Sequence, residues 1–179
     1  MLLGDSVRLR AIEREDLPLF VTWLNDPEVR HYLTIYGPLS QTQEMKWFEE
    51  ILTHPVAEQP LMIETLVDGT WKPLGDIGFL NLDQHSCNAE LGLFIGEKDF
   101  WDKGIGTKAI SLMLDYGFNA LNFHRIYLRV FEPNKRGIHC YEKVGFRHEG
   151  SMREAHFLDG EYVDVLFMSI LREEWRGKS

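Results

Sequence analysis

The middle of the chain constrains the fold most, because it joins a strand to a long amphipathic helix through two glycines and then returns to a strand. Residues 88–96 form a strand-like apolar run, and Gly104 and Gly106 follow it. Apolar residues recur at helical spacing over 104–121, and residues 124–130 alternate as a strand does. A strand, a crossover helix and a second strand in this order predict a parallel pair of strands.

Gly104 and Gly106 also predict an anion site at the start of that helix. Glycines let the chain turn tightly and bring bare N–H groups close to a phosphate, and the helix dipole adds positive charge there. Lys103 and Lys108 would add further charge. The residues around the glycines fit neither the P-loop nor the dinucleotide-binding fingerprint. Two interpretations therefore remain, a pyrophosphate site and a plain structural turn.

Composition indicates a single domain over residues 1–179. The chain holds 28 acidic and 19 basic residues, a formal net charge of −9, which argues against binding to nucleic acid phosphates. It has no apolar run of the roughly 18 residues that a membrane span needs, and its start does not resemble a signal peptide. Cys87 and Cys140 lie far apart, which favours reduced thiols over disulfides or a metal site. We therefore expect a cytoplasmic protein with no membrane, nucleic acid or metal partner.

Local patterns predict the remaining elements. Hydrophobic periodicity, turn residues and capping residues indicate helices at 16–25, from Thr42 onwards and from Asn134 to Gly145, a helical turn followed by a loop at 28–42, and strands at 61–67, 73–80 and 161–171. Asp68 and Gly69 favour a hairpin between the first two of these strands. The strand at 88–96 should join that hairpin as a third antiparallel neighbour.

Two sequence blocks carry a resemblance to a known family. The first is Phe94-Ile95 followed by Trp101-Asp102-Lys103-Gly104-Ile105-Gly106, and the second runs from Asn134 through Tyr141 to Gly145-Phe146. In this order and separation they resemble the Gcn5-related N-acetyltransferases, and the resemblance covers nearly the whole chain. Trp101 stands where that family has Gln or Arg, and tryptophan there is typical of the branch of ribosomal-protein N-terminal acetyltransferases.

Further segments, residues 114–122, 149–150 and 159–162, are similar to spermidine-acetylating members of the same branch. The resemblance implies an α/β fold with a mixed, mostly antiparallel sheet, in which one parallel strand pair is splayed beside the glycine loop and helices flank the sheet. It implies an N-acetyltransferase that moves an acetyl group from acetyl-CoA, its co-substrate, directly to a primary amine of a small molecule or polyamine, without a metal. The coenzyme-binding residues that it implies are Leu93, Phe94, Ile95, Trp101, Asp102, Lys103, Gly104, Ile105, Gly106, Thr107, Asn134, Gly137 and Tyr141.

Glu90 and Tyr141 are the candidates for catalysis. An alkylammonium with a pKa near 10 needs about 4 kcal/mol to lose its proton at pH 7, which favours a base in the site. Glu90 is the first candidate for that base, but it could also orient the amine, relay its proton through water, or be an exposed strand-end glutamate. Tyr141 matches the family position of a phenol that protonates the departing thiolate, and its alternative is a core tyrosine. Asn134 could bind the coenzyme or only cap a helix.

The acceptor should be recognised by the variable segment at 28–50. His31, Tyr32, Tyr36 and Trp47, together with Glu90, could shape a pocket for a small amine or a peptide N-terminus. An aromatic cluster of this kind is also what a lid needs in order to pack. The acceptor thus stays open between a small amine and a protein N-terminal amine.

A polyamine would favour acidic residues in the same segment, and the pattern there is ambiguous. The loop 32–39 contains no carboxylate, and the acids Glu44, Glu49 and Glu50 on the next helix are typical of a solvated face. A noncatalytic acyl-CoA-binding module is a further alternative. The oligomeric state, a homo-oligomer included, is also left open.

Overall fold

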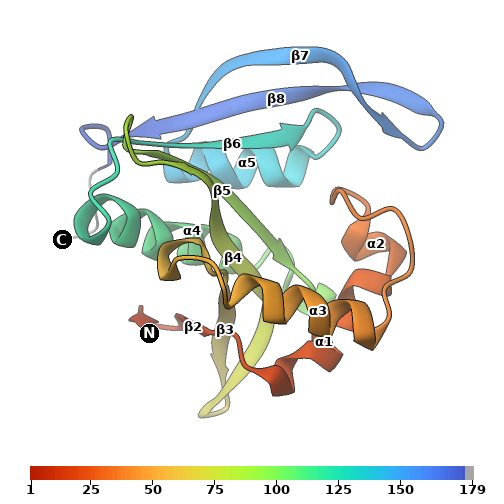
Figure 1. Ribbon diagram of the computed structural model, residues 1–179. Coiled ribbons are helices and arrows are strands. Elements are labelled where there is room, and N and C mark those ends of the chain that lie inside the picture. Colours follow the sequence, from red (N-terminus) through yellow and green to blue (C-terminus); the bar gives the residue numbers. More distant parts are fainter. Residues whose placement is uncertain (176–179) are drawn as a thin grey trace.

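The computed structural model describes residues 1–175 and contains one eight-stranded sheet (Figure 1). Its strands are β1 (Leu2–Leu3), β2 (Val7–Ala11), β3 (Leu61–Val67), β4 (Thr70–Asp83), β5 (Asn88–Ile95), β6 (Arg125–Phe131), β7 (Arg147–Leu158) and β8 (Glu161–Leu171). In space they follow the order β1-β2-β3-β4-β5-β6-β8-β7, and every neighbouring pair is antiparallel except β5 and β6. This mixed sheet confirms the predicted fold class.

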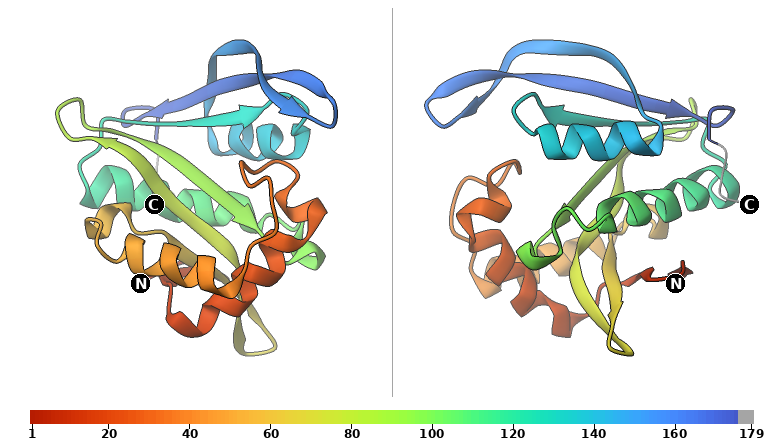
Figure 2. Two further views of the ribbon diagram at one scale, coloured as in Figure 1. Left: turned by 45° about the vertical axis from the view of Figure 1, so that its right-hand side comes forward. Right: turned by 180° about the vertical axis from the view of Figure 1, so that it is seen from behind.

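Helices cover both faces of the sheet (Figure 2). They are α1 (Leu17–Asn25), α2 (Pro27–Arg30), α3 (Gln41–Ile51), α4 (Ile105–Asp115) and α5 (Lys135–Val144). Helices α1 to α3 lie on one face, and α4 and α5 lie on the other. The helix expected over 104–121 ends at Asp115 and continues as a π-helical turn, Tyr116–Ala120. Within residues 1–175, no helix is long and apolar enough to cross a membrane.

The parallel pair of β5 and β6 is short, and this opens the sheet. The two strands pair only at Asn88 with Arg125, Ala89 with Ile126, and Glu90 with Tyr127. Beyond these residues β5 stays paired with β4, while β6 stays paired with β8. The sheet therefore splays apart past Glu90, as predicted.

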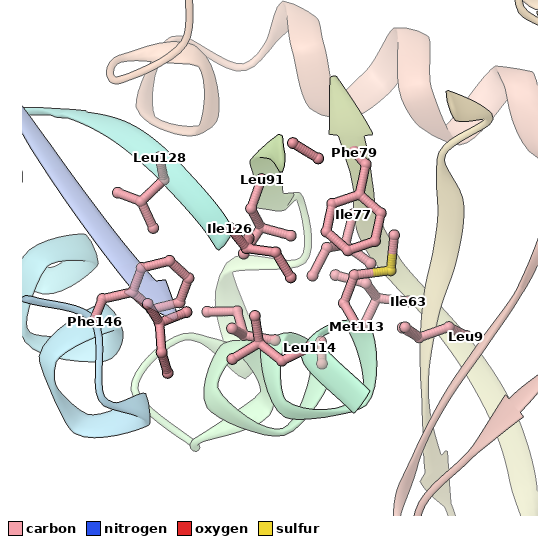
Figure 3. Packing of buried hydrophobic residues seen from close by; sticks show 14 of the residues in the cluster. Leu9, Ile63, Ile77, Phe79, Leu91, Met113, Leu114, Ile126, Leu128 and Phe146 are labelled. Carbon is pink, nitrogen blue, oxygen red and sulfur yellow. The ribbon is translucent and has the colours of Figure 1, made fainter. Parts of the chain in front are cut away.

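The larger hydrophobic core lies between α4 and the sheet. Ala109, Ile110, Met113 and Leu114 of α4 are fully buried and belong to one cluster with strand side chains such as Phe79 (Figure 3). Full burial of a side chain of the size of leucine stabilises the fold by about 1.5–3 kcal/mol relative to exposure. This packing fixes α4, and with it the glycine loop at its start, against β4 and β5.

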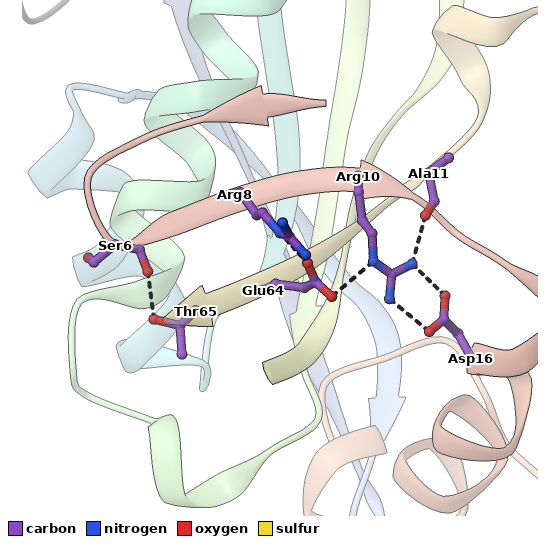
Figure 4. Close-up of polar contacts among 7 residues, drawn as sticks. All are labelled: Ser6, Arg8, Arg10, Ala11, Asp16, Glu64 and Thr65. Carbon is purple, nitrogen blue, oxygen red and sulfur yellow. Dashed lines mark hydrogen bonds and ion pairs between the residues drawn. The ribbon is translucent and has the colours of Figure 1, made fainter. Parts of the chain in front are cut away.

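A polar network anchors α1 on the other face. Glu64 on β3 is 3% exposed and accepts hydrogen bonds from the Nε atoms of Arg8 and Arg10 (Figure 4). Arg10 also forms a bidentate ion pair with Asp16, at 2.7 and 2.8 Å, just before α1 begins. The buried carboxylate of Glu64 is thus compensated, and the start of α1 is tied to β2.

Strand β7 is missing from the sequence prediction. Most of its side chains are exposed, and it lies at the edge of the sheet with β8 as its neighbour. Such a strand needs no buried face, so its sequence lacks the apolar alternation by which strands are recognised.

Glu44 corrects the expectation of a solvated helix face. It is 4% exposed, because it shares with Phe48 and Ile51 the side of α3 that packs toward the sheet. Burial raises the pKa of the Glu44 carboxyl. Burial and the nearby Glu44 raise the pKa of Asp76 on β4 to about 7. Two carboxyl groups therefore interact beneath α3.

Candidate active site

A cavity of about 790 Å³ opens where β5 and β6 part. Its walls come from the end of β5, the glycine loop with the start of α4, the first turns of α5, the end of β6, α2 and part of β7. This volume lies in the range of ligand-binding pockets. The predicted site residues can be placed relative to this cavity.

The glycine loop forms one end of the cavity. Gly104 has a φ of +75°, a left-handed conformation that favours glycine, and it is the N-cap of α4. Lys108 N–H donates to the Gly104 carbonyl at 3.1 Å, which is the first hydrogen bond of the helix. The N–H groups of Ile105, Gly106 and Thr107 come before it, in the first turn, where the helix has no carbonyl to accept from them. These three residues line the cavity. The start of α4 is thus built to receive an anion.

Trp101 joins the end of β5 to this loop. Its Nε1 donates to the Ile95 carbonyl at 2.8 Å, and the Arg136 guanidinium lies over its ring, 3.8 Å from the centroid. Arg136 lines the cavity and was not assigned from the sequence. The available signal was its place in the first turn of α5, where a cation is unfavourable for the helix dipole unless an anion is bound.

The lysines expected at the anion site point elsewhere. Lys103 Nζ lies 5.1 Å from the centroid of the Phe100 ring, and Lys108 Nζ donates to Ser6 Oγ at 2.7 Å. Neither lysine lines the cavity. The lysine and arginine side chains of α5 that line the cavity are instead Arg136 and Lys143.

Helix α5 begins with a capped turn at the cavity wall. The Asn134 Oδ1 accepts from Gly137 N–H at 2.9 Å, which satisfies one of the free donors of the helix start. A Cβ on Gly137 would lie 2.8 Å from Asn134 Nδ2, so a side chain there would displace the cap. Asn134 is therefore an N-cap, and both residues line the cavity.

Tyr141 lies two turns further along α5 and also lines the cavity. Its ring packs edge-on against Phe146, at 5.9 Å between centroids. Burial raises its pKa above the usual value, so the phenol keeps its proton at neutral pH. Burial likewise raises the pKa of the neighbouring Cys140 thiol, whose Sγ lies 3.4 Å from Thr107 Oγ1. The site thus holds a phenol that can donate a proton and a thiol that is a poor nucleophile.

Glu90 lies at the opposite end of the cavity, where β5 and β6 separate. It is 6% exposed, so the alternative of an exposed strand-end glutamate is wrong. Its carboxylate accepts from Arg129 Nε at 2.7 Å, from Arg129 Nη2 at 3.2 Å and from Asn81 Nδ2 at 2.8 Å. These three donors compensate the buried carboxylate. The sequence did not indicate Arg129 or Asn81, because these contacts depend on the pairing of β4, β5 and β6.

The aromatic residues expected at the acceptor do not form one cluster. Tyr32 lines the cavity, and its hydroxyl donates to the Pro133 carbonyl at 3.3 Å. His31 lies outside the cavity lining, with Nε2 3.5 Å from the Asp159 carboxylate. Tyr36 is 74% exposed and stacks on His156, at 6.1 Å between centroids. The α2 segment therefore bridges to the hairpin of β7 and β8, and only Tyr32 of these three faces the cavity.

The fold and the cavity place the chain among N-acyltransferases, and comparison with known proteins makes this specific. A family model described as an acetyltransferase (GNAT) domain matches residues 6–147. The chain therefore belongs to the GNAT family of acetyltransferases, and it is an N-acetyltransferase.

Individual relatives extend over nearly the whole chain. The N-acetyltransferase p20 of Bacillus licheniformis is 30% identical and covers 98% of this chain and 98% of its own length. The spermidine N(1)-acetyltransferase of Escherichia coli is 30% identical over 96% of this chain and 89% of its own length.

A solved structure gives the same result. The spermidine N-acetyltransferase of Vibrio cholerae, in complex with CoA and spermine, has a TM-score of 0.85 and 29% identity, and the match covers 96% of this chain and 98% of that chain. A dodecameric structure of the same Vibrio cholerae enzyme has a TM-score of 0.79 at 29% identity, with 95% and 96% coverage.

Proposed function

We propose that the protein binds acetyl-CoA and transfers its acetyl group directly to a primary amine of a small molecule. The observation that carries this proposal is a single cavity with two different ends. One end holds the free N–H groups at the start of α4 together with Tyr141, and the other holds Glu90 and Arg129. A donor and an acceptor could therefore meet inside it.

The residues of the first end fit a coenzyme with a pyrophosphate. The N–H groups of Ile105, Gly106 and Thr107 would hold the phosphates, and a Cβ on Gly104 would point into open space, so nothing obstructs that approach. Arg136 adds a positive charge at the same wall.

The pantetheine arm would lie along β5. Residues 91–95 pair with β4 on one edge, and β6 has already parted from the other. Leu93, Phe94 and Ile95 line the cavity. Their free backbone groups can pair with the amides of the arm, which requires no side-chain chemistry.

Acetyl-CoA supplies the acetyl group as a thioester. As the amine nitrogen forms its bond to the acetyl carbon, the carbon–sulfur bond breaks, and the departing thiolate needs a proton. Tyr141 can donate it, because burial keeps the phenol protonated. The ammonium proton must leave before the attack, and Glu90 would orient the amine and pass its proton to water.

The acceptor class is supported by the relatives. Those named spermidine acetyltransferases act on a small amine with several amino groups, which supports a small amine or polyamine for this chain. Thiol release should be measured with a monoamine, spermidine and a peptide with a free N-terminus, for the wild type and for Tyr141→Phe. Turnover of small amines that drops in the variant supports the proposal. Turnover of the peptide alone would mean that the acceptor is a protein N-terminal amine. Coenzyme binding without turnover of any acceptor would favour a noncatalytic module.

We also propose a cytoplasmic homo-oligomer. Strand β7 forms an edge of the sheet, and Phe157 on β7 and Tyr162 on β8 are 57% and 67% exposed. The dodecamer of the Vibrio cholerae relative supports assembly, and the free thiols of Cys87 and Cys140 support a reducing compartment. Light scattering of the purified protein would test the assembly, since a monomeric mass would contradict it.

A further inference from the structure

The carboxylate at the acceptor end of the cavity, Glu90, is already paired with a cation. Arg129 binds it through two hydrogen bonds, at 2.7 and 3.2 Å. Glu28, on α2, also lines the cavity, but it is largely exposed and shares Lys98 with Asp26. Among residues 1–175, the third carboxylate that lines the cavity is Asp102, and it belongs to the glycine loop at the coenzyme end.

Other buried acids do not change this balance. Glu44 and Asp76 lie beneath α3, and neither lines the cavity. Phe94, the strand partner of Asp76, packs beside them against Phe20 and Trp23, at 6.1 and 6.2 Å between ring centroids. An ammonium group at the acceptor end therefore meets one compensated carboxylate, Glu90, and the half-exposed guanidinium of Arg129.

We propose that Arg129 makes the site selective for acceptor amines that carry a single positive charge. This rests on the proposed function. A monoamine is neutral once it has lost its proton, so it needs no counter-charge in the cavity. A polyamine keeps its remaining ammonium groups, and near Glu90 they would meet a carboxylate whose charge Arg129 already balances.

The test compares acceptors that share a primary amine and differ in remote charge. Butylamine, putrescine and spermidine should be compared by the kcat/KM for thiol release at one pH and one ionic strength. For the wild type, butylamine should exceed spermidine at least tenfold. Arg129→Gln should shift the ratio of spermidine to butylamine at least tenfold towards spermidine, whereas Arg129→Lys should keep it within threefold of the wild type.

Two further variants separate charge from structure. Arg125→Gln removes an arginine from the same strand, where it pairs with Glu149 outside the cavity, and should leave the ratio unchanged. The double variant Glu90→Gln/Arg129→Gln removes both charges and should return the ratio to the wild-type value.

Circular dichroism will show whether the variants fold. If Arg129→Gln does not fold because Glu90 is left unpaired, Glu90→Gln alone provides the test, since an unpaired Arg129 should shift the ratio at least tenfold towards butylamine. A wild-type preference for spermidine, or a ratio that does not respond to Arg129, overturns this proposal. Absence of turnover with all three amines overturns the proposed function instead.

Discussion

The two ends of the cavity differ in what they offer a ligand. The coenzyme end offers backbone, namely the first N–H groups of α4 and the free edge of β5. The acceptor end offers side-chain charges held in a pair, Glu90 with Arg129. Backbone recognition depends on local turns and glycines, so few substitutions can change it without damage. Charge pairs can be altered by one substitution, so the acceptor end can change specificity while the fold and the donor stay the same.

The largest effect is expected at Tyr141, at the coenzyme end. Tyr141→Phe keeps the ring but removes the proton for the departing thiolate, so kcat should fall by about 10²- to 10⁴-fold. The dissociation constant of CoA, measured by calorimetry, should stay within about threefold of the wild type. A kcat close to that of the wild type would mean that the phenol only packs in the core.

Asp76 differs from Glu90 because another carboxyl group, Glu44, lies near it instead of a cation. Its effect on the stability of the fold should therefore depend on pH. Its folded-state pKa of about 7 lies above the ordinary 3.8, so its contribution to stability is complete below about pH 4 and is lost as the pH rises to about 7. The loss can reach about 4 kcal/mol at 1.36 kcal/mol for each pKa unit, which is an upper limit.

Asp76→Asn should therefore unfold at a higher denaturant concentration than the wild type at pH 8, and the difference should shrink towards pH 4. The exposed Asp99→Asn is the matched control and should show no such trend. A pH-independent difference for Asp76→Asn would contradict the interaction beneath α3.

The backbone end can be tested at Gly106. Its φ is not in the left-handed region, so a substitution tests space rather than backbone strain, which Gly104 would confound. In Gly106→Val the side chain should intrude on the cavity and raise the KM for acetyl-CoA about tenfold or more, which is about 1.4 kcal/mol. Gly37→Ala, where a Cβ meets open space, should leave the KM unchanged. If Gly106→Val left the KM for acetyl-CoA unaltered, the phosphates would not bind at the start of α4.

The smallest effect is expected at Arg136, a charged side chain at the coenzyme end. Arg136→Gln should weaken CoA binding about three- to tenfold at low salt, and the difference should narrow as added salt screens the charge. Lys135→Gln, next to it but paired with Glu132, is the control. Titration calorimetry at two salt concentrations would show the trend. An equal loss in both variants would mean that Arg136 has no specific role.

The contrast between the two ends also explains what the sequence could predict. The helix that begins at the glycine loop and the capped helix that ends at Gly145 follow from residues close together in the chain, and the structure contains both. The role of Tyr141 is inferred from the family resemblance and stays a prediction. Glu90 lies on β5 and Arg129 lies on β6, and the crossover connection separates these two strands in the sequence. The spacing of residues therefore could not show that Arg129 is the partner of Glu90.

Two other misses have the same kind of cause. Strand β7 is stabilised by its pairing with β8 and needs no apolar face, so its sequence shows no strand pattern. The burial of Glu44 depends on how α3 is turned against the sheet, which the helical period alone does not fix.

The free edge of β5 also has a consequence for aggregation. An unpaired strand edge invites pairing with other chains, and the early separation of β6 creates such an edge. Here it lies within the cavity, with Trp101 bonded to its last residue and the start of α5 on another wall. Neighbouring molecules are thus kept from the open backbone, and the gap that leaves room for a ligand does not become a starting point for fibrils.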